Sequence, residues 1–282
     1  MAYPLMEHPT GDRFYYNGLI YEYDSPVAAE LMKPNDSRIY YETVRVLGSC
    51  LLFIEDHMLR LRGSVKGLED FPVDTDRIIS EAYSYIRCCG IVSGNIRIVL
   101  TNTELLIHKA DVKMPSEEDF RSGVNTSLFN WERQTPNLKI FRGDYKTAVN
   151  QKFSQANSHG LPFELILSDS NGKLYEGSMS NMFVVKDGKV YSAPESKILI
   201  GITRRRVIAA LERSGVELTE GMFTLDELKS SDCSMFVSST PFDILPVKYL
   251  DDFEFDSAND PIIRSIASEY SKYTNEYINL KR

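Results

Sequence analysis

The stretch "LYEGSMSNMFVVKDGKVY", residues 174–191, decides how the rest of the chain is interpreted. Two runs of β-forming residues flank a cluster of Gly, Ser and Asn, and one carboxylate, Glu176, stands where the first run ends. A few residues later comes "ILIGITRRRVI", residues 198–208, an apolar run that turns at Gly201 and opens a basic helix. The pattern therefore predicts a carboxylate, small polar side chains and a helix start close together.

The segments around this stretch predict hairpins. Residues 163–194 predict three strands, with turns at Asn171-Gly172 and Asp187-Gly188. "CSMFVSSTPFDILPV", residues 233–247, predicts a strand followed by a tight polar turn. Helices are predicted over 144–160, ending at Gly160, and over 203–215, 224–232 and 261–280.

The N-terminal part predicts another set of hairpins. Asn17-Gly18 separates two aromatic-rich strands, and residues 38–66 predict a strand, a turn at Gly48, a second strand and a helix. A helix is predicted from Thr75, as its N-cap, to just before Gly90, followed by a strand pair over 94–102 and 104–112. Because strands come in hairpins and helices in separate blocks, we expect an α+β fold and not a doubly wound parallel sheet.

The segment "PSEEDFRSG", residues 115–123, is polar and predicts turns, so we expect the domain boundary there. The predicted domains are residues 1–118 and 119–282. A chain of 282 residues is long enough for two domains with substantial cores, and its 43% hydrophobic content is typical of a globular protein.

Composition narrows the class of protein. The net charge of −8 argues against nucleic acid or an anionic membrane as the main partner. The four cysteines show no metal-ligand spacing, so we expect reduced, buried thiols and no metal. No basic segment followed by an apolar core is seen at the N-terminus, and no run of about 18 apolar residues could span a bilayer. We expect a cytoplasmic protein.

Three features point to one cofactor. Gly201-Ile202-Thr203 leaves backbone N–H groups and a hydroxyl at a helix start, which can hold a phosphate or merely cap the helix. Lys146 precedes or opens a helix; a buried lysine can lose its proton and attack a carbonyl, whereas a surface lysine stays charged. A carboxylate such as Glu176 can keep a pyridine nitrogen protonated. Together these are the groups that pyridoxal 5'-phosphate (PLP) requires.

The order of these motifs resembles the signature of the class IV, or fold-type IV, PLP enzymes. That family includes branched-chain and D-amino-acid aminotransferases and aminodeoxychorismate lyases. "YEGSMSNMFVVKDGKVY" and "ILIGITRRRVI" match its Glu, Asn and Gly-Ile-Thr-Arg pattern, and "FVSSTPFDILPV" resembles its later strand. "YYETVRV" and "IEDHMLRLRGSVKGL" resemble its early segment, so the resemblance covers residues 40–247. It implies a homodimer with a smaller N-terminal α/β domain and a larger, β-rich C-terminal domain.

The resemblance also implies residue roles. Lys146 would form the internal aldimine and move the α-proton, Glu176 would pair with the pyridinium nitrogen, and Arg60 would grip the phosphate. The other interpretation of Arg60 is a solvated helix residue paired with Glu55 or Asp56. The remaining cofactor-binding positions are the phosphate cup, Ile202, Thr203, Ser239 and Thr240, and the cofactor wall, Ser180 and Asn181.

The substrate side departs from the family pattern. Many members carry a Tyr five residues after the lysine, where this chain has Gln151, and "KPNDSRIY" replaces a Gly-rich stretch. An arginine-bearing loop that some members use for a substrate carboxylate is missing; Arg97 or Arg38 could replace it or lie on the surface. Tyr40 and Tyr41 are expected to place one side chain in the substrate pocket and one in the core, because strand neighbours alternate faces.

The resemblance to this family implies an aminotransferase that moves an amino group from an amino acid to a 2-oxo acid. The first alternative is a lyase that releases pyruvate from aminodeoxychorismate, which uses the same fold and cofactor. The second is a relative that has lost turnover and acts as a binding or scaffold protein, since the usual Tyr is absent.

Overall fold

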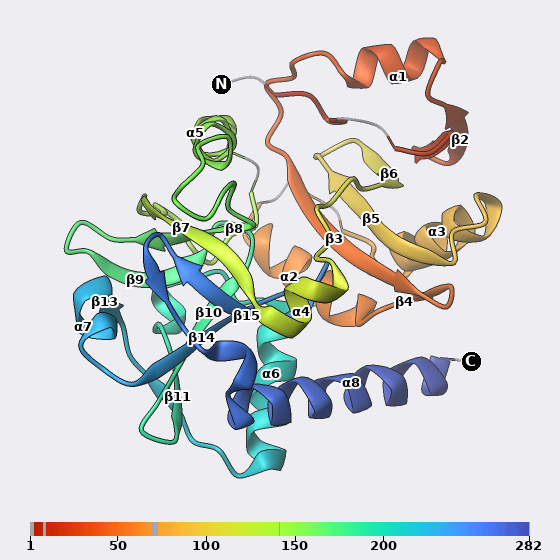
Figure 1. The fold of residues 1–282 in the computed structure, drawn as a ribbon. Helices are drawn as coiled ribbons and strands as arrows, with labels where there is room; N and C mark the ends of the chain where they lie inside the picture. The colour runs from red at the N-terminus through yellow and green to blue at the C-terminus, as the bar shows by residue number, and fades with distance from the viewer. Residues whose placement is uncertain (1–2, 8–9, 69–70, 72, 141, 282) are drawn as a thin grey trace. The chain divides into compact units, whose positions relative to one another are not determined.

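The computed structural model describes residues 3–7, 10–68, 71, 73–140 and 142–281, and its chain forms two compact units. Unit 1 comprises Met1–Lys113, Leu138–Asp144 and Glu276–Arg282; unit 2 comprises Met114–Asn137 and Tyr145–Asn275. Each unit has its own sheet and helices (Figure 1), so the predicted α+β class is confirmed. The predicted division after residue 118, as a boundary between independent domains, stays a prediction.

Unit 1 is built on a sheet with strand order β2-β1-β6-β5-β3-β4. The Asn17-Gly18 hairpin is confirmed, with both residues at positive φ as a tight two-residue turn requires. Along β3 buried and half-buried residues alternate strictly, as expected for a strand with one face on a core. The strands are β1 (Arg13–Tyr16), β2 (Leu19–Glu22), β3 (Tyr40–Leu47), β4 (Cys50–Leu51), β5 (Ser93–Leu100) and β6 (Leu105–Lys109).

Three helices accompany this sheet: α1 (Pro26–Leu31), α2 (Ile54–Ser64) and α3 (Thr75–Cys88). The N-cap of α3 is Asp74, whose side chain accepts from the Arg77 N–H, so the prediction of Thr75 as the cap is wrong by one residue. The core of unit 1 lies where α2 and α3 cover the sheet, with Val44, Ile96 and Ile98 completely buried.

Unit 2 is built on a mixed sheet with order β12-β11-β10-β14-β15-β7-β8-β9-β13; β16 pairs with β15, and β9 also pairs with β10. Its strands are β7 (Val124–Asn130), β8 (Glu164–Ser168), β9 (Lys173–Gly177), β10 (Asn181–Lys186), β11 (Lys189–Ser192), β12 (Leu218–Glu220), β13 (Phe223–Thr224), β14 (Cys233–Ser239), β15 (Asp243–Leu250) and β16 (Phe253–Glu254). Residues 163–194 form four strands, not the predicted three, because a third turn at residues 178–180 separates β9 from β10.

The helical segments of unit 2 correct two further predictions. They are α4 (Glu117–Ser122), α5 (Gly143–Phe153, which begins in unit 1), η1 (Glu195–Lys197), α6 (Ile202–Ser214), α7 (Leu225–Lys229), η2 (Ser257–Asn259) and α8 (Pro261–Lys281, whose end belongs to unit 1). The segment predicted as turns contains α4, which a Ser116–Asp119 capping box stabilises. Helix α5 ends at Phe153 and not at Gly160.

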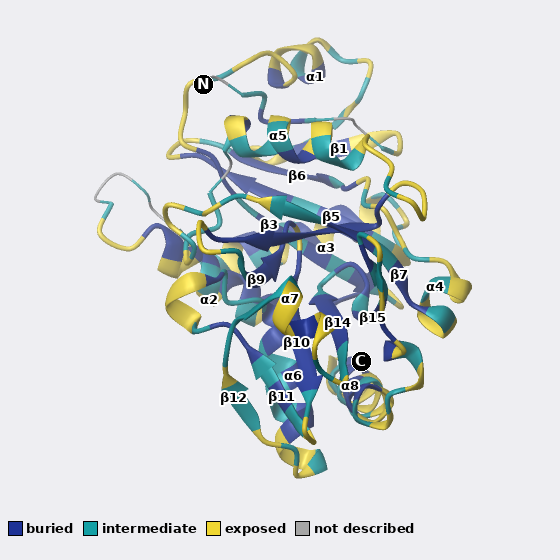
Figure 2. Cartoon of the chain, turned by 60° about the vertical axis from the view of Figure 1, so that its left-hand side comes forward, coloured by how far each residue is buried: buried dark blue, intermediate teal, exposed yellow. Residues whose placement is uncertain are grey.

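The core of unit 2 lies along its central strands. Strand β8 is buried along its whole length. Strand β10 is buried along nearly its whole length, whereas α4 is exposed (Figure 2). Phe183 stacks on Phe236 with ring centroids 4.7 Å apart. All four cysteines are free, but only Cys50 is buried and Cys88 is exposed, so the prediction of buried thiols is wrong for Cys88.

Candidate active site

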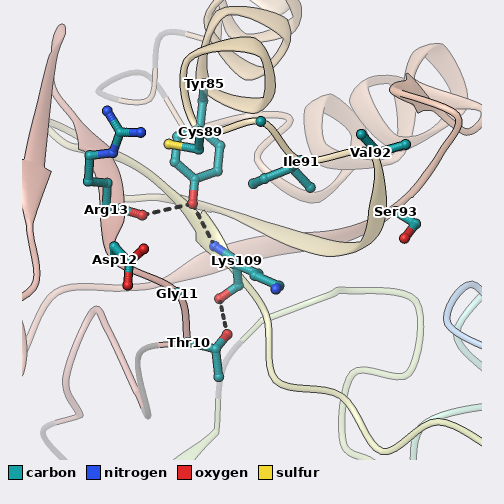
Figure 3. A pocket seen from close by; sticks show the side chains of 11 residues that line it. Thr10, Gly11, Asp12, Arg13, Tyr85, Cys89, Ile91, Val92, Ser93 and Lys109 are labelled. Carbon is teal, nitrogen blue, oxygen red and sulfur yellow. Dashed lines mark hydrogen bonds between the residues drawn. The ribbon is translucent and has the colours of Figure 1, made fainter.

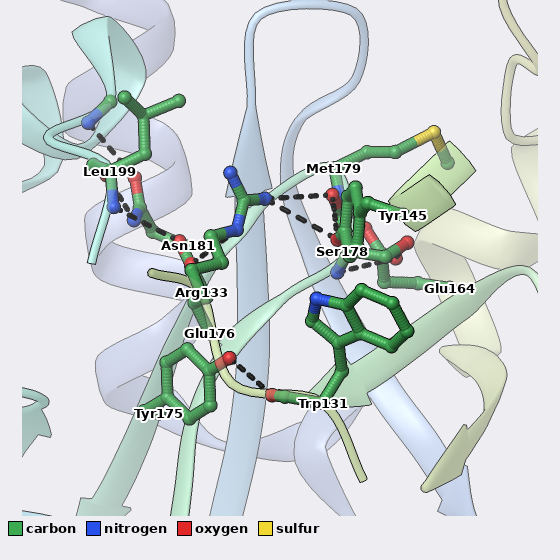
Figure 4. A network of polar contacts seen from close by, with 11 residues as sticks. Trp131, Arg133, Tyr145, Glu164, Tyr175, Glu176, Ser178, Met179, Asn181 and Leu199 are labelled. Atoms are coloured by element: carbon green, nitrogen blue, oxygen red, sulfur yellow. Dashed lines mark hydrogen bonds and ion pairs between the residues drawn. The ribbon is translucent and has the colours of Figure 1, made fainter. Parts of the chain in front are cut away.

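Glu176 lies at the end of β9, 1% exposed, and both of its oxygens are engaged. Oε1 lies 2.9 Å from Nε of Arg133, and Oε2 accepts a hydrogen bond from the Leu199 N–H at 3.1 Å. Leu199 stands two residues before Gly201, where the chain turns into α6. One buried carboxylate therefore holds both an arginine and the loop that leads into this helix (Figure 4).

The turn between Glu176 and β10 surrounds a second buried carboxylate, Glu164, at the start of β8. Oε1 accepts from the Leu165 N–H at 2.8 Å, from the Ser178 N–H at 3.1 Å and from the Ser178 hydroxyl at 2.6 Å. Oε2 accepts from the Met179 N–H at 3.2 Å and from the Ser180 hydroxyl at 2.8 Å. Burial raises the pKa of Glu164, and these hydrogen bonds oppose the shift. Ser180, predicted as part of the cofactor wall, directs its hydroxyl to this carboxylate.

Asn181 fixes the start of α6. Its amide donates to the Leu199 carbonyl at 2.8 Å, and its Oδ1 accepts from the Gly201 N–H at 3.1 Å. A Cβ at position 201 would lie 2.2 Å from that oxygen, so only glycine fits. What requires glycine here is the close approach of the backbone, because the φ of Gly201 is an ordinary −70°.

The N-terminus of α6 has the features of an anion site. None of the side chains that the structure describes caps this 13-residue helix, and Ile202 and Thr203 in its first turn are buried. Within the described part of the chain, the Ser238 hydroxyl is buried without a hydrogen-bond partner, and Ser238 pairs with Asn181 across β14 and β10. The neighbouring Ser239 hydroxyl donates to the Met179 carbonyl at 2.7 Å, and Thr240 is half-buried. Four predicted residues thus lie on segments that hydrogen bonds connect: Glu176, Asn181, Thr203 and Ser239.

Lys146 lies in the first turn of α5 and is half-buried. Burial lowers the pKa of Lys146 to about 8, so a substantial part of this amine is neutral near physiological pH. The preceding residue, Tyr145, donates its hydroxyl to the Ser178 carbonyl at 3.0 Å, which ties α5 to the turn between β9 and β10. Gln151, five residues after Lys146, is exposed.

Arg60 belongs to unit 1, where its guanidinium holds Glu42. Nε donates to Oε1 of Glu42 at 2.8 Å and Nη2 donates to Oε2, while Nδ1 of His57 lies 2.7 Å from Oε2. Burial raises the pKa of Glu42, but the charge of Arg60 and the bonds from Arg60 and His57 outweigh it and hold that pKa well below its usual range. The side chain of Arg60 is 8% exposed and pairs with Glu42, so its interpretation as a solvated residue is wrong.

The predicted substrate residues also lie in unit 1. Tyr40 is buried in the core, whereas Tyr41 is half-buried, with the Arg97 guanidinium 5.4 Å and the Lys139 amine 5.0 Å from its ring centroid. Arg97 also pairs with Glu7 at 3.5 Å. Arg38, the other arginine considered, is exposed. Tyr41 and Arg97 are thus brought together.

A cavity of about 370 Å³ lies elsewhere in unit 1, between the start of β1, the end of α3 and Lys109 (Figure 3). Its polar groups bond to one another: the Tyr85 hydroxyl donates to the Arg13 carbonyl and accepts from the Lys109 N–H, and the Thr10 hydroxyl donates to the Lys109 carbonyl. None of the predicted site residues lines this cavity. Among the described residues, no cluster of His, Cys, Asp or Glu could hold a metal, and no helix is long and apolar enough to cross a membrane.

Comparison with known proteins identifies the family. The family model "Amino-transferase class IV" matches residues 40–250. Branched-chain-amino-acid aminotransferase of Salmonella typhimurium is 29% identical over 218 residues, which are 70% of this chain and 69% of that protein. The branched-chain amino acid aminotransferase of T.th., solved with pyridoxamine 5'-phosphate, matches with a TM-score of 0.78 at 20% identity and covers 96% of both chains.

A Legionella pneumophila protein assigned as a 4-amino-4-deoxychorismate lyase matches with a TM-score of 0.72 at 20% identity, covering 84% of this chain and 91% of that one. The fold is therefore that of the fold-type IV enzymes, as predicted. The chain belongs to the class IV aminotransferase family, and that family implies PLP as its cofactor.

Three residues of the site were missed by sequence reasoning: Arg133, Tyr145 and Glu164. Arg133 lies in the loop "NWERQTP" and Tyr145 at a helix start, where nothing in the sequence predicts their partners. Glu164 did leave a signal, because it is the only charged residue in the strongly apolar strand "ELILS". A lone carboxylate on a buried strand requires donors, and the serines of the signature stretch provide them.

Proposed function

We propose that this chain is a PLP-dependent aminotransferase that moves an amino group from an amino acid to a 2-oxo acid. The observation that carries the proposal is the double engagement of Glu176, which holds Arg133 through one oxygen and the loop before α6 through the other. This contact joins a buried acid to an uncapped helix N-terminus within one unit. PLP is a pyridine ring with a phosphoryl group, so it needs an acid for its ring nitrogen and an anion site for its phosphate.

The residues present fit the cofactor. The first-turn N–H groups of α6 and the hydroxyls of Thr203 and Thr240 are the donors that a phosphate accepts, and the buried Ser238 hydroxyl adds one more. Gly201, where a Cβ would not fit, allows the backbone to approach closely. When bound, PLP supplies an aldehyde that bonds to amines and a ring that accepts the electrons of a carbanion.

The proposed roles of the chain's own groups follow from their chemistry. Lys146, whose amine loses its proton near pH 8, would hold the cofactor covalently and then move the proton at the substrate α-carbon. Glu176 would hold a proton on the ring nitrogen. In unit 2, Ile202, Thr203, Ser239 and Thr240 would bind the phosphoryl group, and Ser180 and Asn181 would shape the cofactor wall. Of the residues of unit 1, we assign Arg60 to the phosphate and Tyr41 and Arg97 to the substrate, while Tyr40 is the member of the tyrosine pair that lies in the core.

For the substrate we propose a branched-chain amino acid, because the Salmonella relative and the T.th. structure carry that activity in their names. We further propose a cytoplasmic homodimer, following the family. A pyruvate-releasing lyase is the second candidate, and the similarity to the Legionella structure favours it. A protein without turnover is the third, and the exposed Gln151 in place of the usual Tyr supports it.

One screen separates these candidates. The purified protein is loaded with PLP, and its visible absorbance is followed on adding L- and D-amino acids, together with keto-acid formation from a 2-oxo-acid acceptor and pyruvate release from aminodeoxychorismate. The proposal predicts a band that changes with branched-chain donors and a new keto acid. Pyruvate release without a new keto acid would identify the protein as a lyase. A visible absorbance band that no donor changes would identify it as inactive.

A further inference from the structure

The buried carboxylate of Glu164 lies outside every role assigned above, yet five hydrogen bonds reach it from its own strand and from the turn at residues 178–180. All five donors are neutral N–H or O–H groups. Hydrogen bonds to an ionised acceptor are roughly twice as strong as those between neutral groups. The turn is also packed tightly around the carboxylate, since a Cβ on Gly177 would lie 3.0 Å from its Oε2 and 2.0 Å from the Ser180 hydroxyl.

The direction of these bonds fixes the direction of the turn's carbonyl groups. In a trans peptide the N–H and the C=O point to opposite sides. The Met179 N–H points to Glu164, so the Ser178 carbonyl of the same peptide points away from it. There it accepts from the Tyr145 hydroxyl at 3.0 Å and from Nη2 of Arg133 at 3.1 Å.

The next peptide, between Met179 and Ser180, is flanked by two groups that Glu164 binds. Glu164 binds the Met179 N–H on one side of it and the Ser180 hydroxyl on the other, and the Met179 carbonyl between them accepts from the Ser239 hydroxyl at 2.7 Å. Arg133 in turn contacts Glu176 at 2.9 Å. Hydrogen bonds and an ion pair thus connect Glu164, through the Ser178 peptide and Arg133, to Glu176 (Figure 4). Through the Met179 carbonyl they connect it to the Ser239 hydroxyl.

We propose that Glu164 is a positioning residue of the cofactor site, which orients the peptides of Ser178 and Met179 so that their carbonyls hold Arg133, Tyr145 and Ser239 in place. The inference rests on the proposed function for the identity of the ligand, but the positioning itself can be measured without it. Trp131, the single tryptophan, lies 5.5 Å from the Tyr145 ring, so its fluorescence reports the position of that ring.

The test compares Glu164→Gln with Asp169→Asn. Glutamine keeps the shape but presents an NH₂ group to two of the donors, which turns the Ser178–Ser180 peptides. Asp169 is a matched control: it is 8% exposed, lies just beyond β8, and accepts from the Asn171 and Lys173 N–H groups at 2.9 Å in the opposite turn of the β8–β9 hairpin. Thermal unfolding, Trp131 emission without cofactor, and the dissociation constant of added PLP are measured for each.

For Glu164→Gln we expect altered Trp131 emission in the cofactor-free protein and roughly 10- to 100-fold weaker PLP binding, by analogy with the loss of affinity when an outer partner of a metal ligand is removed. Asp169→Asn should lower the unfolding temperature but change neither the Trp131 emission nor the dissociation constant of PLP. Unchanged emission and affinity in Glu164→Gln, or equal losses in Asp169→Asn, would overturn the inference. If Glu164→Gln does not fold, Ser178→Ala removes one donor and should change both readouts in the same direction.

The two proposals fail separately. A wild-type protein that binds no PLP contradicts the proposed function, while Trp131 emission still decides whether Glu164 positions the turn. A wild-type protein that binds PLP, with Glu164→Gln binding equally well and emitting identically, contradicts only the inference.

Discussion

Arg133 and Glu176 form an ion pair at the end of β9, with Nε and Oε1 2.9 Å apart and with 20% and 2% of their side chains exposed. The guanidinium also donates to the Ser178 carbonyl, so it is held from two sides. The acid proposed for the ring nitrogen is therefore already fixed in the structure.

Arg133→Met should destabilise the protein, because it leaves the Glu176 charge buried beside an apolar chain. We expect a loss of about 2 kcal/mol in the free energy of unfolding, below the roughly 3–5 kcal/mol of a fully buried pair since Arg133 keeps some contact with water. Urea unfolding of the cofactor-free protein measures it. Lys189→Met, which breaks the exposed pair with Glu217 in the same unit, should change stability little. Equal stability of the Arg133 variant and wild type would show that the pair is not formed.

Glu176→Gln should impair turnover and leave cofactor attachment intact. The neutral amide cannot stabilise a protonated ring nitrogen, so we expect kcat/KM to fall roughly 100-fold, as for the loss of one preorganised electrostatic contact. Steady-state rates with a branched-chain donor measure turnover, and visible absorbance measures attachment. Wild-type rates in this variant would remove Glu176 from the mechanism.

The pKa of Lys146 predicts a pH dependence. The folded protein loses this proton near pH 8 because burial lowers the pKa from 10.5 to about 8. Attachment requires the neutral amine, so the rate of cofactor attachment should rise with pH up to about 8 and then level off. Stopped-flow absorbance, recorded at a series of pH values from about 6 to about 10, gives the midpoint. A midpoint near the ordinary lysine value would contradict the assignment.

The same shift affects stability. Between about pH 8 and 10.5 the unfolded chain still holds the Lys146 proton and the folded chain does not, so the stability of the cofactor-free protein should rise with pH across this window. Below it both states are protonated, and the contribution is constant. Lys146→Ala should remove this part of the pH dependence.

Gly201→Ala should weaken PLP binding through a clash and not through backbone strain. The new Cβ would lie 2.2 Å from Oδ1 of Asn181, so the loop must move away from α6. Asn181→Ala removes the clashing oxygen. The double variant should therefore lose less free energy of PLP binding than the sum of the losses in the two single variants. Gly63→Ala, in a helix with open space around the glycine, is the control and should be neutral or slightly stabilising. Strict additivity would contradict the close contact.

Much of the fold could be predicted from local signals. The Asn17-Gly18, Asn171-Gly172 and Asp187-Gly188 turns lie between strands as their dipeptides indicate, and α6 begins directly after Gly201. The turn at residues 178–180 was missed because its N–H and hydroxyl groups bond to Glu164, a residue of another strand. Helix α4 was missed because its residues are polar, and only the Ser116–Asp119 capping box distinguishes them from a loop.

The site was predictable where one residue type carries the chemistry, as with the isolated Glu176. It was not predictable where a residue acts through a partner distant in sequence. Arg133 meets Glu176 from a loop before β8, and Arg60 meets Glu42 from a neighbouring helix. Such pairings depend on sheet order, which hydrophobic periodicity does not encode.

The most direct test of the central claim is chemical mapping of the lysine. PLP-loaded protein is reduced with borohydride, digested, and its peptides are sequenced by mass spectrometry. The account predicts a phosphopyridoxyl group on Lys146, lost in Lys146→Ala. A label on another lysine, such as Lys139 beside Tyr41, or no label at all, would contradict it.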